Sequence, residues 1–181
     1  MGGSRVVPGV IAPRPSDAVP PASFEEIYRR HERDVVRYLT LLLRRPDDAE
    51  DLAADTFRRA FEAWRDGRGP AGRPLPWLLT IARRQALNRW RRRRLIEWLP
   101  LPVGRRDLGA EASSADREFW LWLDALARAL PERQREVLFL RYRRELNDTE
   151  IGEVMGLSAS GVRSLRARAI QSLREHPELL R

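Results

Sequence analysis

Arginine side chains have the clearest capacity for chemistry in this sequence, and they occur in groups. Positions 83–94 read RRQALNRWRRRR, and positions 163–168 read RSLRAR. The guanidinium group stays charged and donates paired hydrogen bonds to phosphate or guanine. Like charges this dense on one helix repel each other by a few tenths of a kcal/mol per close pair, and a polyanion relieves that repulsion. Nucleic acid is therefore the favoured ligand, and a solvated basic face is the alternative.

Other chemistries have little support. The chain contains no cysteine, no lysine and only two histidines, His31 and His176. A thiolate metal site, a cysteine nucleophile and a lysine-bearing phosphate loop are thus excluded. The acidic run DDAED at positions 47–51 could in principle bind a hard cation. Charge at a helix N-terminus and a polar interface are the favoured roles for it. We expect no enzyme activity, no metal and no cofactor.

The overall composition agrees with a nucleic-acid partner. The chain has 181 residues and a formal net charge of +8, which favours a polyanionic ligand. No apolar run is long enough to cross a membrane, and the N-terminus has no signal-peptide core. We therefore expect a cytoplasmic protein that does not insert into membranes. Residues 1–22 are rich in Pro and Gly and predict a flexible tail.

Helical spacing of apolar residues organises the first half. Ser23 with Glu26 predicts a capping box at the start of one helix, and Pro46 ends it. Asp47 with Glu50 predicts a second capping box, for a helix that ends near Asp66 and Gly67. A loop to Pro74 follows, and Pro76 suits the first turn of a third, basic helix. His31 lies on the apolar stripe of the first helix and is expected to be structural.

The second half predicts a helix at Asp116–Leu130, another that restarts at Pro131, and a helix-turn-helix at Asp148–Ala169. In that motif Gly156 suits a left-handed turn residue, and Ser158 or Ser160 suits the next N-cap. Gly152 would let the two helices approach closely. An ordinary helical hairpin is the alternative. No stretch alternates with the period of a strand, so the predicted fold is all-α, with two small helical bundles joined by a flexible linker.

Four stretches in this order resemble the extracytoplasmic-function sigma factors of the sigma-70 family, which are subunits of bacterial RNA polymerase. The stretches are FEEIYRRHERDVVRYL, DAEDLAADTFRRAFEAW, PWLLTIARRQALNRWRRRR and LPERQREVLFLRYRRELNDTEIGEVMGLSASGVRSLRARA. The resemblance implies sigma region 2 at residues 23–98, a linker at 99–115 and sigma region 4 at 116–181. It implies a promoter-specificity subunit that binds core RNA polymerase. The alternative is a helix-turn-helix regulator that binds DNA as a conventional dimer.

The resemblance also implies roles for individual residues. The surface for the polymerase β′ coiled coil would include Asp48, Glu50, Asp51, Asp55, Phe57 and Arg58. The −10 element would be bound by Arg73, Arg83, Arg84, Asn88, Arg89 and Arg91. The −35 element would be bound by Ser158, Ser160, Arg163, Ser164, Arg166 and Arg168.

For some of these residues a more specific role is expected. Arg163 is the leading base reader, and Arg168 is expected to hold phosphate. The family usually has Asn at the position of Arg84 and Asp at that of Asn88, so the −10 base preference is left open. Trp77 could stack on a base, but a core position is preferred. The segment Leu130–Tyr142 would meet the polymerase β flap, with Val137, Leu138 and Leu140 either there or in the core.

The predicted linker limits how the two regions can act. About 18 flexible residues span on average about 20–25 Å and reach about 60 Å when extended. Two turns of DNA measure about 70 Å. The regions can therefore bridge −10 and −35 elements only if the polymerase holds the linker stretched, and the chain alone should bind promoters weakly. An anti-sigma factor is a further partner that the resemblance allows.

Overall fold

The computed structural model describes residues 23–96 and 114–175, and every regular element in these ranges is a helix. The elements are α1 (Phe24–Leu43), α2 (Pro46–Arg65), α3 (Pro74–Ile96), α4 (Ser114–Ala129), α5 (Glu132–Leu138), the π-helix η2 (Phe139–Arg143), α6 (Asp148–Met155) and α7 (Ala159–Arg174). The all-α prediction is confirmed. The predicted N-terminal tail and nearly all of the predicted linker lie outside the described residues.

Helix α1 begins where the sequence predicts. The Ser23 hydroxyl accepts a hydrogen bond from the Glu26 amide at 3.3 Å, so Ser23 is the N-cap. The helix ends at Arg44, which has a left-handed conformation (φ 55°) and donates its amide hydrogen to the Thr40 carbonyl. That bond satisfies one of the carbonyls that a helix end leaves open.

Helix α2 corrects the prediction of a second capping box. Its N-cap is Arg45, and no side chain caps the helix. Pro46 occupies the first position, where a missing amide hydrogen is harmless and the fixed φ suits a helix. Asp47 and Asp48 then lie in the first turn, where their charge complements the helix dipole. Helix α3 begins at Pro74, so Pro76 lies in its first turn, as predicted.

The three helices of the first half enclose an apolar core. Val35, Leu39, Phe57, Leu78 and Leu79 are all less than 5% exposed. One buried polar contact joins α2 to α3, because Gln85 donates to the Thr56 hydroxyl at 2.9 Å and Thr56 donates to the Leu52 carbonyl. Trp77 is half-buried and packs against this core, as preferred from the sequence.

The second half contains the predicted helix-turn-helix, formed by α6 and α7. Gly156 ends α6 with a left-handed φ of 66°, and the Ser158 hydroxyl caps α7 by accepting from the Gly161 amide at 3.1 Å. A Cβ atom on Gly152 would lie 2.5 Å from the Leu157 carbonyl oxygen, so this close approach requires glycine. Ile151, Met155, Val162 and Leu165 are buried between the helices, as predicted.

The helix predicted to run on from Pro131 is not uniform. Residues 139–143 form a π-helix, in which the Arg144 amide reaches back to the Phe139 carbonyl at 3.2 Å. Leu146 follows, fully buried, with its amide bonded to the Leu140 carbonyl at 3.0 Å. The wider turn places Phe139 and Leu140 in the core and leaves Tyr142 exposed.

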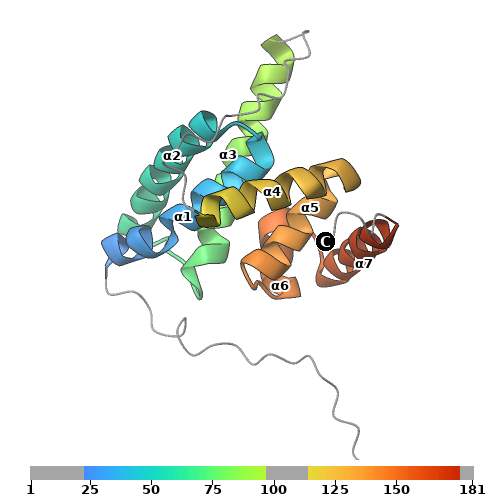
Figure 1. Ribbon diagram of the computed structural model, residues 1–181. Coiled ribbons are helices and arrows are strands. Elements are labelled where there is room, and N and C mark those ends of the chain that lie inside the picture. The colour runs from blue at the N-terminus through green and yellow to red at the C-terminus, as the bar shows by residue number, and fades with distance from the viewer. Residues whose placement is uncertain (1–22, 97–113, 176–181) are drawn as a thin grey trace, which may run out of the picture.

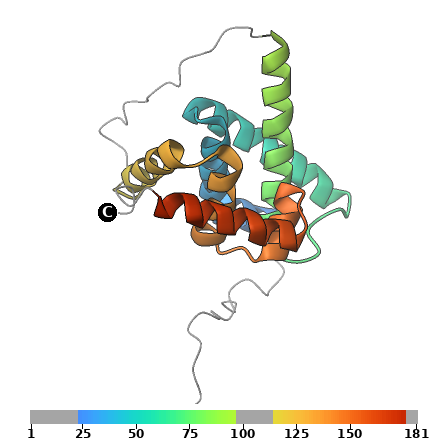
Figure 2. The same ribbon diagram turned by 90° about the vertical axis from the view of Figure 1, so that its right-hand side faces the viewer.

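The two halves, predicted as two small helical bundles, pack against each other. Helix α3 contacts α6, and α1 contacts α5. The Tyr38 ring on α1 stacks on Phe139 with 5.9 Å between ring centroids. Figures 1 and 2 show α4 to α7 gathered beside α1 and the first turns of α3, whose C-terminal end projects away from the other helices. No helix in the described part of the chain is long and apolar enough to span a membrane.

Candidate nucleic-acid and polymerase interfaces

Helix α3 presents an exposed polar face made of Arg84, Asn88 and Arg91. These residues are spaced four and three apart, so they lie on one side of the helix, and all three are exposed. Trp90 is also half exposed, on the side of α3 that Arg83 and Leu87 share. The face offers two guanidinium groups and an amide, which can bind phosphate and base edges.

The other three residues predicted for the −10 element lie elsewhere and form ion pairs. Arg89 donates to Asp48 on α2 at 2.6 Å. Arg83 donates through Nε to Glu136 on α5 at 2.7 Å. Arg73 donates through Nη1 to both carboxylate oxygens of Glu150 on α6, at 3.1 and 3.2 Å. The structure thus places only half of the predicted −10 set on one accessible face.

Helix α7 has the two faces that a DNA recognition helix needs. Its buried side is Val162, Leu165 and Ala169, and its exposed side is formed by Ser160, Arg163, Ser164 and Arg168. Recognition helices lie in the major groove and contact base edges with such exposed side chains.

Two of the six residues predicted for the −35 element, Ser158 and Arg166, stabilise the position of α7. Ser158 is the N-cap described above, and it also shares a hydrogen bond with Ser160 at 3.0 Å. Arg166 is half-buried and forms a close ion pair with Asp148 at the start of α6. Four of the six therefore lie on the accessible side of the helix.

Helix α2 carries the acidic surface predicted for polymerase binding. Glu50, Asp51 and Asp55 are exposed, and Arg58 pairs with Asp55 at 3.3 Å and with Glu62 at 2.9 Å. The paired acids raise the pKa of the Arg58 guanidinium, the hydrogen bond to Asp55 first.

Two members of the predicted polymerase set lie below this surface. Phe57 is 4% exposed, and the Asp48 side chain is 15% exposed in its ion pairs with Arg89 and Arg45. In the segment predicted for the β flap, Val137, Leu138 and Leu140 are buried in the core. These side chains therefore support the surfaces rather than form them.

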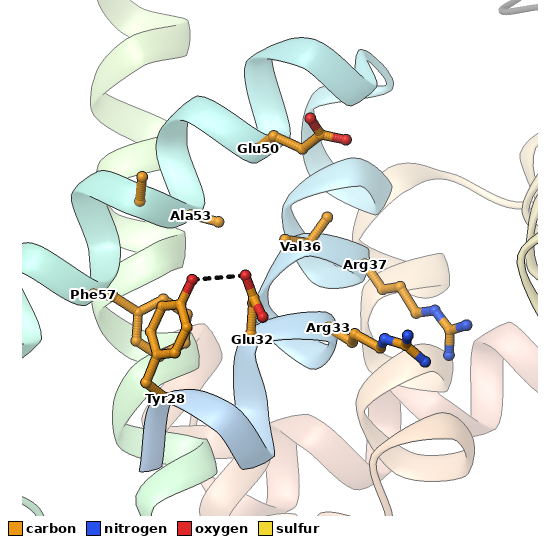
Figure 3. A pocket seen from close by; sticks show the side chains of 9 residues that line it. Tyr28, Glu32, Arg33, Val36, Arg37, Glu50, Ala53 and Phe57 are labelled. Atoms are coloured by element: carbon orange, nitrogen blue, oxygen red, sulfur yellow. Dashed lines mark hydrogen bonds between the residues drawn. The ribbon is translucent and has the colours of Figure 1, made fainter. Parts of the chain in front are cut away.

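Sequence reasoning missed a groove of about 490 Å³ between α1 and α2. Its lining includes Tyr28, Val36 and Phe57, together with Glu50 of the predicted polymerase surface. The Tyr28 ring lies against Phe57, with 4.7 Å between centroids, and its hydroxyl donates to Glu32 at 2.7 Å (Figure 3). This bond to Glu32 raises the pKa of Tyr28. Tyr28, a partly exposed aromatic residue beside the apolar stripe of α1, was the available signal.

The acidic residues do not gather around a metal site. Among residues 23–96 and 114–175, no group of three or more His, Asp or Glu side chains could hold a metal ion. The exposed faces of α2, α3 and α7 therefore present surfaces for macromolecules, one acidic and two basic or polar.

Comparison with known proteins yields two family matches. Residues 27–96 match Sigma-70 region 2, and residues 126–175 match Sigma-70, region 4. The chain is 33% identical to the RNA polymerase sigma-E factor of Streptomyces antibioticus over 161 residues, which cover 86% of this chain and 84% of that protein. It is 32% identical to the RNA polymerase sigma factor CarQ of Myxococcus xanthus, with 84% and 88% covered.

Solved structures show the same fold. The sigma factor RpoE of Bartonella quintana, in complex with the anti-sigma factor NepR, matches 87% of this chain and 96% of its own with a TM-score of 0.64 at 22% identity. CnrH in complex with the cytosolic domain of CnrY matches 86% and 87% with a TM-score of 0.58 at 24% identity.

Proposed function

Because this chain belongs to the extracytoplasmic-function sigma factors of the sigma-70 family, we propose that it binds core RNA polymerase and directs initiation at promoters with −10 and −35 elements. One observation supports this most: a single chain carries two separate exposed faces that bear arginine, on α3 and α7, together with an exposed acidic face on α2. We assign no reaction to the chain itself, and we place its action in the cytoplasm with the polymerase.

The −10 assignment begins with the exposed face of α3. Arg84, Asn88 and Arg91 are proposed to contact the opened −10 element, and the half-exposed Trp90, on the Arg83 side of α3, is proposed to stack on an unpaired base. Arg73, Arg83 and Arg89 are proposed to join them once their carboxylate partners are displaced. Phosphate is a competing anion that can take these guanidinium groups.

The −35 assignment depends on the exposed side of α7. Arg163 is proposed to read a base edge, with Ser160 and Ser164 beside it, and Arg168 is proposed to hold phosphate. Ser158 contributes by fixing the N-terminus of α7, and Arg166 by pairing with Asp148, which holds α7 against α6.

Polymerase binding is proposed for two places. The acidic face of α2, with Glu50, Asp51, Asp55 and Arg58, and the neighbouring α1–α2 groove would receive the β′ coiled coil. The exposed side of α5 and η2, which includes Tyr142, would meet the β flap. An anti-sigma factor is a further proposed partner, since the similar RpoE of Bartonella quintana was solved with the anti-sigma factor NepR bound.

Run-off transcription tests this function. Start sites are first mapped in cells that overproduce the chain, and these promoters are then transcribed with purified core polymerase. We expect initiation only when the chain is added, and none from templates with a scrambled −10 or −35 element. Sequence-specific DNA binding without initiation would instead indicate the dimeric helix-turn-helix regulator.

A further inference from the structure

We propose that the groove between α1 and α2 is a docking site for a proline-rich segment of the same chain, residues 12–21 (APRPSDAVPP). This segment lies outside the described residues and is joined to α1 by only Ala22 and the N-cap Ser23. Three properties of the groove carry the inference: its aromatic surface, the acidic side chains at its edge and its distance from the start of α1.

A row of aromatic rings leads from the start of α1 into the groove. The Phe24 ring lies 5.3 Å from Phe61 and 6.5 Å from Phe57, measured between centroids. Phe57 in turn contacts Tyr28 in the groove. Phe57 is buried, but Phe61 is 48% exposed and Tyr28 is 37% exposed. Neighbouring exposed apolar side chains mark interaction sites on soluble proteins, and this site begins where residues 1–22 join the helix.

Proline matches such a surface well. Grooves lined by aromatic side chains bind proline-rich segments, because a polyproline II helix is formed before binding and loses little conformational entropy. The segment contains four prolines in ten residues. The groove has a volume of about 490 Å³, which is room for a few residues of extended chain.

Charge at the edge of the groove gives the segment a direction. Glu32 and Glu50 line the groove from α1 and α2. The Glu32 carboxylate already accepts from the Tyr28 hydroxyl, whereas Glu50 has no ion pair with any residue of 23–96 or 114–175. Arg14 is the only cation of the segment, and Glu50 is its partner in the docked arrangement.

Two arginines also line the groove but leave its aromatic side open. Figure 3 shows the guanidinium groups of Arg33 and Arg37 directed away from Tyr28 and Phe57. Arg37 lies over the Phe119 ring of α4, at 5.6 Å from the ring centroid. The segment therefore meets aromatic and acidic side chains before it meets these cations.

The length of the segment fits the groove. Because an α-helix rises about 1.5 Å per residue, Val36 in the groove lies about 18 Å along α1 from Phe24. Glu50 is two turns before Phe57 on α2, so it lies toward the Val36 end. A polyproline II chain rises about 3.1 Å per residue, so residues 14–21 span about 22 Å. Arg14 can therefore reach Glu50 after the chain reverses direction before α1.

Docking of the segment has a consequence for polymerase binding. Glu50 belongs both to the groove and to the acidic face of α2 proposed for the β′ coiled coil. The segment and the polymerase then compete for this surface, so the segment lowers the affinity of the chain for core polymerase. This consequence rests on the proposed function, whereas docking of the segment does not.

Paramagnetic broadening of amide signals measures docking in the full-length chain. The sequence has no cysteine, so a spin label on Ser16→Cys attaches only to the segment. We expect strong broadening of the Val36 and Ala53 amides in the groove and little broadening of Arg59, which lies on another side of α2. An undocked segment would broaden Arg59 and Ala53 alike.

Matched charge reversals test the pairing. Arg14→Glu should lower the ratio of docked to undocked chain roughly two- to fivefold, the range expected for an exposed ion pair. Adding Glu50→Arg to the same chain should restore docking, because the two charges are opposite again. Arg5→Glu makes the same charge change outside the segment and should leave the broadening of Ala53 unchanged.

Three results would overturn the inference: equal broadening of Arg59 and Ala53, equal effects of Arg14→Glu and Arg5→Glu, or no restoration by Glu50→Arg. Broadening found only between spin-labelled and isotope-enriched chains in a mixture would assign the groove to the segment of a second copy, and would overturn docking within one chain.

Affinity for core polymerase provides a separate readout. Arg14→Glu should bind core polymerase more tightly than the parent chain, by the same two- to fivefold, and Arg5→Glu should not. Docking without any change in polymerase affinity would count against the α2 surface of the proposed function rather than against docking, so the two failures are distinguishable.

Discussion

Two arginines of α7 lie three residues apart but have different surroundings. The side chain of Arg163 is 59% exposed, with 4.0 Å from its Nη1 to a carboxylate oxygen of Asp148. The Arg166 side chain is 22% exposed and pairs closely with that same carboxylate. Arg163 is therefore available to a DNA base, whereas Arg166 holds α7 against the first residue of α6.

Replacing Arg163 should change promoter choice. Arg163→Ala is expected to lose roughly 1–3 kcal/mol of discrimination at one base pair of the −35 element, the value of a bidentate arginine–guanine contact. Assembly with core polymerase should not change. Run-off transcription on promoters with each −35 base varied measures the effect, with Arg166→Ala as a control that lowers thermal stability instead. An unaltered base preference in Arg163→Ala would show that another residue reads the −35 element.

Tyr38 makes the stability of the folded chain depend on alkaline pH. Burial, followed by the neighbouring Glu136 charge, raises its pKa well above the ordinary value of 10.0. The folded state thus favours the neutral phenol, and the associated stability is complete below about pH 10 and is lost as the pH rises through the raised pKa.

Absorbance of tyrosinate measures this effect. The chain has three tyrosines, and one equivalent of tyrosinate should appear only together with unfolding. Tyr38→Phe should remove that delayed phase. Complete ionisation of all tyrosines while the helices remain folded would contradict the prediction.

The sequence predicted which side chains are exposed better than it predicted which side chains pair with each other. Periodicity correctly placed Arg163 on the outward face of α7, because a helix fixes which side each residue occupies. It did not identify Glu136, which pairs with a residue 53 positions away. Phe57 was predicted to lie on the polymerase-binding surface, but it is buried beneath Tyr28. Either of two neighbouring aromatic rings can be the buried one, and only the packing of the folded chain decides which.

The close contact between Gly152 on α6 and the turn that follows α6 allows a test of how the helix-turn-helix is packed. Gly152→Ala would place a methyl group 2.5 Å from the Leu157 carbonyl oxygen, and that carbonyl belongs to the backbone of the turn. Overpacking of this kind is expected to reduce the free energy of unfolding by about 1–3 kcal/mol.

Urea unfolding measures the loss. Gly72→Ala is the matched control, because no atom lies within 4 Å of the added methyl group there. It should stay within about 0.5 kcal/mol of the parent chain. Equal stability of the two variants would mean that the turn adjusts without strain.

Helix α2 allows a separate test of polymerase docking. Asp51→Arg combined with Asp55→Arg reverses two exposed charges on one face and should prevent co-purification with core polymerase, while helix content is retained. Asp124→Arg, at an exposed position of α4, serves as the control and should still assemble. Normal assembly of the double variant would place the docking surface elsewhere.

Element type was predictable, while element ends and irregular turns were less so. Apolar spacing and the Gly156–Ser158 turn correctly predicted α6 and α7. The predicted capping box of α2 was wrong because Pro46 occupies the first helical position, so Asp47 lies inside the helix and does not cap it. No local sequence pattern predicts the π-helix at 139–143. Its extra residue is accommodated because Phe139 and Leu146 pack in the core, and that packing involves residues from other helices.

At the scale of the whole molecule, the contact between the two halves and the proposed DNA-binding faces should respond differently to salt. The side chains of the Arg83–Glu136 pair are 16% and 2% exposed, and buried pairs are screened much less than exposed ones. Promoter binding, by contrast, releases counterions and weakens steeply as salt increases.

Energy transfer between dyes on cysteines placed at the exposed Arg59 of α2 and Gln171 of α7 reports the contact between the halves. It should stay constant between about 50 and 200 mM salt, a range in which binding through 6–10 phosphates weakens by about 10³–10⁵. Parallel titrations of transfer and of promoter binding by the assembled polymerase measure both responses. Loss of transfer over this range would show that exposed charges, rather than the buried pair, hold the halves together.

The buried Glu136–Arg83 pair also constrains which substitutions the chain can accept one at a time. Replacing either partner alone leaves a buried charge without its counterion, which destabilises a fold by about 3–5 kcal/mol. Replacing both partners together by apolar residues of similar volume is often neutral. The two positions, 53 residues apart in the sequence, should therefore change together rather than singly.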